Sequence, residues 1–237
     1  MVTGSLFLSG GGGAEDSLLL DSAFASAVGS GPLWYWPVAM DPTGVDYTAC
    51  LDWVTGVFAP LGVDEIHMWD GADGEPAGRL AEFRGVYIGG GNTFRLLAVL
   101  RRHGLPPALQ RFVENGGAVY GGSAGAAVLG ADITTVAHLD VDSCHTTDPR
   151  GLDLLAGHGV FVHHRLQDAP RAQDWARRNG RPVVALDERA GAVLTDGRLT
   201  AVGFEPVYLI ENQVRSLQPG ESVVLPLTTP GSPAPVG

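Results

Sequence analysis

The sequence predicts an α/β fold, with a doubly wound, mostly parallel sheet, helices on both faces and a C-terminal antiparallel hairpin. Apolar runs of strand length alternate with longer helical patterns, which is typical of parallel sheets. The 34 glycines favour a chain rich in turns. Near the end, Asp196-Gly197 separates two apolar runs, and this pair is preferred in two-residue hairpin turns.

The elements follow from these patterns in chain order. Short, continuous apolar runs bounded by glycine or polar residues predict buried strands at 6–8, 33–38, 65–69, 86–88, 118–120, 159–162 and 183–186. Apolar residues at helical spacing predict helices at 16–28, 46–58, 92–102, 106–114 and 170–178. The hairpin strands are expected at 191–195 and 198–204. We expect one α/β domain over 1–225 and a flexible, proline-rich tail over 226–237.

Composition excludes several classes of function. All 15 basic residues are arginine, so a Schiff-base lysine and a phosphate loop ending in Gly-Lys are absent from the sequence. The net charge of −11 and a first basic residue at Arg79 argue against nucleic-acid and anionic-membrane partners. Cys50 and Cys144 have no metal or redox spacing, so we expect no metal and no cofactor. The N-terminus lacks a signal-peptide pattern, and we expect a cytoplasmic protein.

One serine lies between glycines where a strand is expected to meet a helix. Residues 120–126 read Tyr-Gly-Gly-Ser-Ala-Gly-Ala, which matches the Gly-x-Ser-x-Gly pattern of a nucleophile elbow. Such a turn exposes the serine hydroxyl above the sheet and directs the next N–H toward a developing oxyanion. We therefore expect Ser123 as the nucleophile and the Ala124 N–H as an oxyanion donor.

Two other glycine clusters follow predicted strands. Residues 9–13 do not satisfy the dinucleotide-binding pattern, because Glu15 occupies the position of its last glycine, and we interpret them as a turn above the sheet. Residues 89–94 place glycine amides beside the elbow, since neighbouring strand ends meet in one crevice of a parallel sheet. The Gly91 N–H is the expected second oxyanion donor, and Asn92 is expected to cap the following helix.

A catalytic serine needs a base and an acid that orients it. His163 and His164 follow a predicted strand, and only one of them can face Ser123 because successive strand residues point in opposite directions. Asp187 and Glu188 follow the next strand in the same position and are the candidate acids.

Four segments together resemble the serine peptidase family that includes dipeptidase E and cyanophycinase. They are Ile-Gly-Gly-Gly-Asn-Thr-Phe-Arg-Leu-Leu at 88–97, the elbow at 121–126, the His-Arg pair after the sixth strand, and Leu-Asp-Glu at 186–188. The resemblance implies a class I glutamine amidotransferase-like fold and a triad in the order serine, histidine, acid. It implies Ser123 as nucleophile, His164 as base, and Gly91 and Ala124 as oxyanion donors.

The sequence departs from the family pattern at two positions. His138 stands where dipeptidase E has its third triad residue, and the Asp-Glu pair instead resembles the cyanophycinase branch, which favours Glu188 as the acid. Arg165 stands where the family has phenylalanine after the catalytic histidine, which keeps His163 as an alternative base.

The resemblance implies a serine exopeptidase or dipeptidase that cleaves a small peptide after an acidic residue. An acidic side chain in a partly buried pocket needs a fixed cation, which here must be arginine or a charged histidine. The candidate substrate-binding residues are Asn92, His163, Arg165 and Arg171. We favour Arg171 because its alanine neighbours leave room for a ligand.

Three other functions and the assembly state stay open from the sequence. A cyanophycinase-like hydrolase of β-aspartyl-arginine is the alternative within the family. An α/β-hydrolase-type esterase would need an acid between serine and histidine, such as Asp148, and its usual His-Gly-Gly-Gly loop is absent. A non-catalytic relative would hold a small anion in the glycine loops. A homodimer is left open as well.

Overall fold

The computed structural model describes residues 4–72 and 74–225, so the predicted tail at 226–237 lies outside the described residues. The strands are β1 (Ser5–Ser9), β2 (Leu33–Trp36), β3 (Ile66–Met68), β4 (Gly85–Ile88), β5 (Ala118–Gly122), β6 (Gly159–Phe161), β7 (Val183–Leu186), β8 (Ala190–Thr195), β9 (Arg198–Gly203), β10 (Val207–Ile210), β11 (Val214–Leu217) and β12 (Ser222–Val224). The helices are α1 (Ala14–Val28), α2 (Tyr47–Phe58), α3 (Pro76–Arg79), α4 (Thr93–Arg102), α5 (Leu105–Glu114), α6 (Ala124–Leu129) and α7 (Ala169–Asn179).

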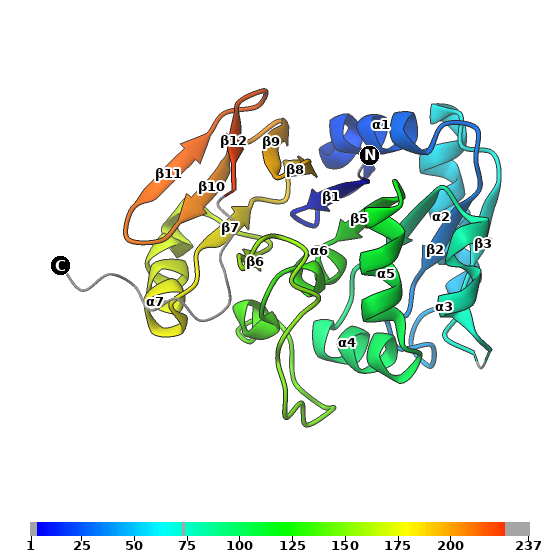
Figure 1. Cartoon of the computed structure of the whole chain (residues 1–237), viewed down its shortest axis with the longest axis horizontal. Coiled ribbons are helices and arrows are strands. Elements are labelled where there is room, and N and C mark those ends of the chain that lie inside the picture. The colour runs from blue at the N-terminus through cyan, green and yellow to red at the C-terminus, as the bar shows by residue number, and fades with distance from the viewer. Residues whose placement is uncertain (1–3, 73, 226–237) are drawn as a thin grey trace.

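A large sheet with the order β12-β9-β8-β1-β5-β4-β2-β3 forms the centre of the molecule (Figure 1). Strands β1, β5, β4, β2 and β3 are parallel, whereas β8, β9 and β12 pair antiparallel. The register aligns Ser9 with Gly122 and Ile88 with Gly121, so the carboxyl ends of β1, β4 and β5 share one edge. The predicted fold class is confirmed, and the glycine loops and the elbow meet at this edge.

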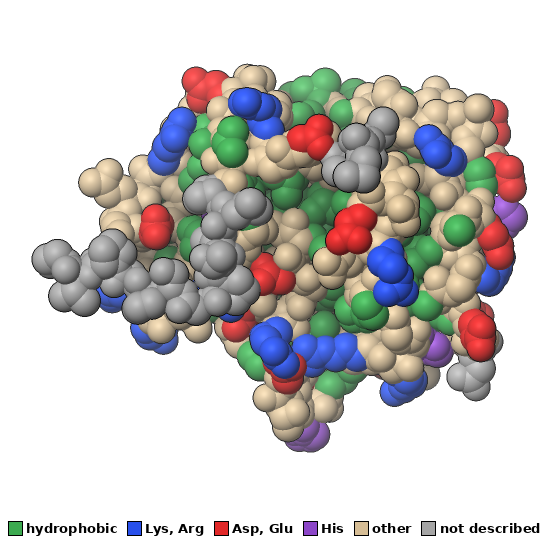
Figure 2. Space-filling view, in the orientation of Figure 1, with side chains coloured by type: hydrophobic (Ala, Val, Ile, Leu, Met, Phe, Trp, Pro, Cys, Tyr) green, Lys and Arg blue, Asp and Glu red, His purple; other side chains and the backbone are tan. Residues whose placement is uncertain are grey.

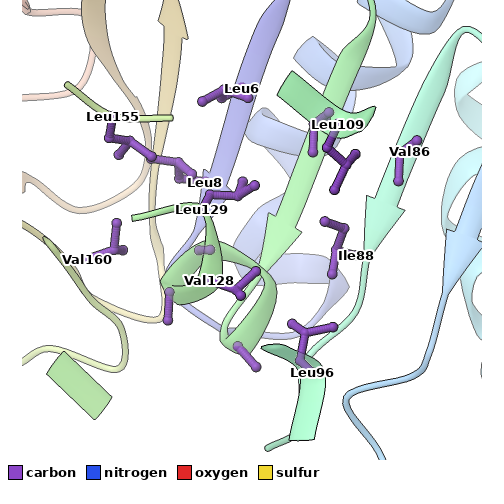
Figure 3. Close-up of a cluster of buried hydrophobic side chains, with 14 of the residues drawn as sticks. Leu6, Leu8, Val86, Ile88, Leu96, Leu109, Val128, Leu129, Leu155 and Val160 are labelled. Carbon is purple, nitrogen blue, oxygen red and sulfur yellow. The ribbon is translucent and has the colours of Figure 1, made fainter. Parts of the chain in front are cut away.

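The two faces of the sheet have separate cores because strand side chains alternate with a period of two. Phe7, Tyr35, Tyr87 and Tyr120 face α1 and α2, where Phe24 packs edge-on against Phe7 and Tyr120. The opposite face packs against α4, α5 and α6 through an aliphatic cluster, drawn in Figure 3. Its labelled members on the sheet are Leu6, Leu8, Val86 and Ile88, and those on the helices include Leu96, Leu109, Val128 and Leu129.

A second sheet differs from the sequence-based expectation. Strands β6 and β7, predicted as further strands of the parallel sheet, instead form a four-stranded sheet with the order β11-β10-β7-β6 (Figure 1). The edge of β1 that they would have extended is paired antiparallel with β8, in the register Ser9 to Gly191. Helix α7 covers the second sheet through a small core around Phe161 and Trp175. Strands β10, β11 and β12 were not predicted.

The surface carries mixed charge. On the face shown in Figure 2, acidic side chains and arginines are interspersed among hydrophobic side chains rather than gathered by sign. Within the described ranges, no helix combines the length and the apolar character that a membrane span requires.

Candidate active site

Ser123 occupies the turn between β5 and α6, as the elbow pattern predicts. Its backbone has φ of 50° and ψ of −107°, a conformation that non-glycine residues rarely adopt. Strand and helix approach closely here, since a Cβ on Gly121 would lie 2.5 Å from the carbonyl group of Gly125. The close approach requires glycine at these positions and leaves the serine side chain partly exposed at the sheet edge.

Two hydrogen bonds join Ser123 to a histidine and a carboxylate. The Ser123 Oγ lies 2.8 Å from His163 Nε2, and His163 Nδ1 lies 3.0 Å from Glu188 Oε1. A carboxylate only accepts, so Nδ1 carries the proton and Nε2 is left to accept the serine proton. The His163 side chain is one-third exposed and that of Glu188 about half exposed, at 33% and 53%. The arrangement is that of a serine, a base and an orienting acid.

The structure brings His163, not His164, to the serine, so the expectation for His164 is corrected. The His164 ring is 2% exposed and lies edge-on to Tyr208 in the second sheet, with 5.7 Å between ring centroids. Neither ring nitrogen has a partner within the described part of the chain. Burial disfavours the charged ring and lowers the pKa of His164.

Backbone geometry explains this outcome. Strand β6 ends at Phe161, and His163 has φ of 50°, so the regular alternation of a strand does not extend to it. The His163 N–H donates to Gly10 O and the His164 N–H donates to Leu186 O, both at 2.9 Å. Consecutive residues are thus attached to the two different sheets, and only the first of them faces the elbow.

The end of β1 and the loop that follows it hold the backbone of Ser123, His163 and Glu188. The contacts are Ser123 N–H to Ser9 O at 3.2 Å, His163 N–H to Gly10 O at 2.9 Å, and Gly12 N–H to Glu188 O at 3.1 Å. Gly11 has φ of 113°, and a Cβ there would overlap the His163 ring. The sequence pattern indicates only a turn for residues 9–13, although their position after the first strand also places them at the edge where catalytic groups gather.

Backbone amides beside Ser123 are available as oxyanion donors. The N–H groups of Gly91 and Ala124 donate no hydrogen bond among the described residues. Gly91 has φ of 137°, and a Cβ there would lie 2.6 Å from the carbonyl oxygen of Ala39, so glycine is required. Gly90 also approaches the nucleophile, since a Cβ on it would lie 3.5 Å from the Ser123 Cβ.

Asn92 caps helix α4, as predicted, and its other polar atom is also engaged. Its Oδ1 accepts from the Arg95 N–H at 2.9 Å, and its Nδ2 donates to the Val141 carbonyl at 2.8 Å. Both polar atoms of the Asn92 side chain are therefore hydrogen-bonded within the protein, without a substrate.

The two candidate arginines lie after the β6 strand, apart from the cavity described below. Arg165 is exposed, and Arg171 on α7 is half exposed, with its Nη1 4.0 Å from Asp168 Oδ1. His138, which stands where the family has an aspartate, stacks against Phe161 with 5.9 Å between ring centroids. In the described part of the chain, the side-chain hydrogen bonds of Ser123 and His163 join neither of these arginines nor His138.

A cavity of about 560 Å³ opens beside Ser123. Its floor is formed by the glycines that follow β1, β4 and β5, and one wall is formed by α2 and the loop before it. The larger side chains of its lining are Tyr35, Met40, Val45, Cys50, Trp53 and Tyr87. This volume is that of a small-molecule or short-peptide site. Sequence analysis did not identify these residues, which come from four separate segments.

Helix α1 carries a buried carboxyl group. Asp21 on α1 is 3% exposed and accepts a hydrogen bond of 2.7 Å from the Tyr120 hydroxyl. Burial raises the pKa of Asp21 to about 6, and the hydrogen bond from Tyr120 offsets part of that rise. Burial likewise raises the pKa of Tyr120 well above its ordinary value.

The remaining acidic and metal-ligating groups lie elsewhere. Asp148, the acid that an α/β-hydrolase-type triad would need, is paired with Arg150 at 2.7 Å and with Arg101 at 3.3 Å. These contacts lower the pKa of Asp148 and attach it to the surface near α4, away from His163. Among residues 4–72 and 74–225, no three His, Cys, Asp or Glu side chains gather as a metal site would require.

Comparisons with known proteins point to a peptidase family. The model of peptidase family S51 matches residues 6–202. Peptidase E of Streptomyces coelicolor is 40% identical over 82 residues, which cover 35% of this chain and 33% of that protein. Peptidase E of Citrobacter koseri is 36% identical over 116 residues, which cover 49% of this chain and 45% of that protein. The chain thus spans less than half the length of either relative.

A solved structure extends the similarity to the fold. A candidate peptidase E protein from Listeria monocytogenes EGD-e superposes with a TM-score of 0.70 at 18% identity. The match covers 86% of this chain and 100% of the other. At this level of identity, the likeness concerns the fold alone.

Proposed function

The chain belongs to peptidase family S51, and on this basis we propose that it is a serine peptidase that cleaves short peptides after an acidic residue, with aspartyl dipeptides as its substrates. The observation that supports a serine mechanism is the continuous pair of hydrogen bonds from Ser123 through His163 to Glu188. The names of the relatives support a peptidase, since both are peptidase E.

In the proposed mechanism, Ser123 Oγ attacks the peptide carbonyl while His163 Nε2 takes the hydroxyl proton. His163 then gives this proton to the leaving amine as the carbon–nitrogen bond breaks, which leaves an acyl-enzyme. Water enters with His163 again as the base and releases the acid product. Glu188 holds the Nδ1–H tautomer and stabilises the charged ring, while the Ala124 N–H and the Gly91 or Gly90 N–H bind the oxyanion.

The proposed preference for an acidic residue requires a cation that binds the acidic side chain. Arg165 and Arg171 follow His163 within eight residues, on the side of the triad that carries the second sheet. We propose that the acidic side chain binds on this side, with Arg171 as its anchor and Arg165 as the alternative.

A dipeptide panel together with serine labelling tests the proposal. Asp-X, Glu-X, Asn-X and β-Asp-Arg peptides are compared as substrates of the wild type and of Ser123→Ala, and both proteins are treated with a fluorophosphonate. We expect labelling of the wild type alone, cleavage of Asp-X, and loss of activity in the variant. A variant that kept more than about a tenth of kcat, a loss below roughly 1.4 kcal/mol, would exclude Ser123 as the nucleophile.

The panel also separates the alternatives. Preferred cleavage of β-Asp-Arg would indicate a cyanophycinase-like hydrolase. Hydrolysis of short p-nitrophenyl esters without any peptide cleavage would indicate an esterase, a reading that the surface ion pairs of Asp148 disfavour. A protein that is neither labelled nor active would be a non-catalytic relative.

A further inference from the structure

The cavity beside Ser123 has walls that are apolar in character. The rings of Tyr35 and Tyr87 form its side along the sheet, and Met40 and Val45 precede the helix that closes it. On this wall, the Tyr35 hydroxyl is paired with the Cys50 thiol. A ligand group in the cavity therefore meets mainly carbon.

The charge of the lining disfavours an acidic ligand group. Among the described residues that line the cavity, Asp46 is the charged one, and it is a carboxylate. One of its oxygens, Oδ1, accepts from the Thr48 N–H at 2.8 Å as the N-cap of α2. An aspartate side chain of a substrate would meet like charge here, and none of the described lining residues is a cation that could offset it.

One face of α2 forms this wall of the cavity. Asp46, Ala49, Cys50 and Trp53 are spaced i, i+3, i+4 and i+7, so they lie on the same side of the helix and all line the cavity. Trp53 is 47% exposed although it is a large apolar residue, and it stands where a bound apolar group would cover part of it.

From these features we propose that the cavity is the subsite for a large aliphatic or aromatic side chain of the substrate, on the residue joined to the acidic residue by the scissile bond. The preferred substrates are then Asp-X peptides in which X is leucine, phenylalanine or a similar bulky apolar residue. This inference rests on the proposed peptidase function for its position relative to the bond. The cavity volume of about 560 Å³ accommodates an aromatic side chain.

The test compares Asp-Ala, Asp-Leu, Asp-Phe and Asp-Arg as substrates of wild type, Ala49→Trp and Thr55→Trp. Ala49 is exposed and lines the cavity, so a tryptophan there fills it, whereas Thr55 lies on the opposite, exposed face of α2. In the wild type, kcat/KM for Asp-Phe should exceed that for Asp-Ala by at least about tenfold. Ala49→Trp should bring this ratio close to one, and Thr55→Trp should preserve it.

A second variant, Trp53→Ala, tests the same wall in case Ala49→Trp does not fold. Trp53→Ala removes one wall at an exposed position and should lower the same ratio, with the thermal unfolding midpoint measured for every variant. Equal kcat/KM for Asp-Ala and Asp-Phe in the wild type would overturn the proposal. Preference for Asp-Arg that is lost in Asp46→Asn would also overturn it, in favour of a subsite for a basic side chain.

Binding measurements separate this inference from the peptidase proposal. Ser123→Ala retains the cavity, so calorimetry with this variant should show tighter binding of Asp-Phe than of Asp-Ala, and added Ala49→Trp should cancel the difference. If the wild type cleaves no peptide but these binding results hold, the cavity assignment stands and the peptidase function fails. If the wild type cleaves Asp-X without regard to X, the function stands and the cavity assignment fails.

Discussion

Ser123 and His163, whose side chains are 2.8 Å apart, both have φ of 50°. Ser123 directly follows β5 and His163 comes two residues after β6, and each residue leaves the extended conformation there. Positive φ strains the backbone of a non-glycine residue, and this conformation persists only where surrounding contacts stabilise it. The contacts here are backbone hydrogen bonds to Ser9 and Gly10, so one loop positions both partners.

The two adjacent histidines should differ sharply in their effect on activity. We expect His163→Gln to lower kcat by about 10²–10⁴-fold, because the variant has no base for the serine proton. The matched His164→Gln variant alters a ring that is buried away from Ser123, so it should retain most of kcat. We expect this substitution to change the thermal unfolding midpoint instead. Steady-state kinetics of both variants check this, and the reverse ranking would restore His164 as the base.

The acid is expected to be Glu188 rather than its neighbour. Glu188→Gln should reduce kcat on the order of 10²-fold with little change in KM, because the carboxylate acts on the charged ring formed during the reaction. Asp187 Oδ1 accepts from the Arg189 N–H at 3.0 Å and shapes the turn, so Asp187→Asn should be milder. A larger kcat loss for Asp187→Asn than for Glu188→Gln would contradict the assignment.

Gly11 should prove essential for the position of His163. Gly11→Ala adds a Cβ that overlaps the imidazole at a backbone φ of 113°, and we expect kcat to fall about 10²-fold through displacement of the ring. Gly13→Ala is the control in the same loop, since φ is −76° and the nearest atom to its Cβ would be 3.9 Å away. Similar kinetics for the two variants would show that the loop does not position the base.

Arg171 on α7 should govern the selectivity for acidic substrates. Arg171→Met is expected to lose about 2–4 kcal/mol in kcat/KM for Asp-X and little for an uncharged ester, because a cation would contact the side chain and not the reacting carbonyl. Arg165→Met is the comparison. Equal losses on both substrates would indicate structural support, and unchanged selectivity in both variants would remove this loop from acidic recognition.

Asp21 should make stability depend on pH. Its pKa is about 6 in the folded chain against 3.8 as the ordinary value, so the folded state binds a proton more readily. Stability from this group is therefore full below about pH 4 and declines as pH rises to 6, by on the order of 3 kcal/mol. Denaturation of wild type and Asp21→Asn from pH 4 to 8 should show this decline only in the wild type. Exposed Asp52→Asn serves as the control, and parallel wild-type and Asp21→Asn curves would refute the prediction.

Much of the fold could be predicted because it depends on local pattern. The alternation of apolar strands and helices placed α1, α2, α4, α5 and α7 within two residues of their observed bounds. Strands β11 and β12 were missed because most of their residues are exposed and they contain no longer apolar run. Strand β10 is an apolar run, Val-Tyr-Leu-Ile, that was overlooked. The separation into two sheets was also missed, since strand pairing depends on which edge of β1 is occupied.

The sequence by itself determined the elbow around Ser123, the need for glycine beside it and the candidate acids Asp187 and Glu188, because turn chemistry and strand ends are local properties. The family resemblance then favoured Glu188. Only the tertiary structure shows that His163, and not His164, lies beside Ser123. That choice depends on a positive φ held by a hydrogen bond to Gly10, more than 150 residues earlier in the chain. The cavity likewise arises where four distant segments meet, and the direction of a side chain across such contacts is not encoded in the spacing of its neighbours.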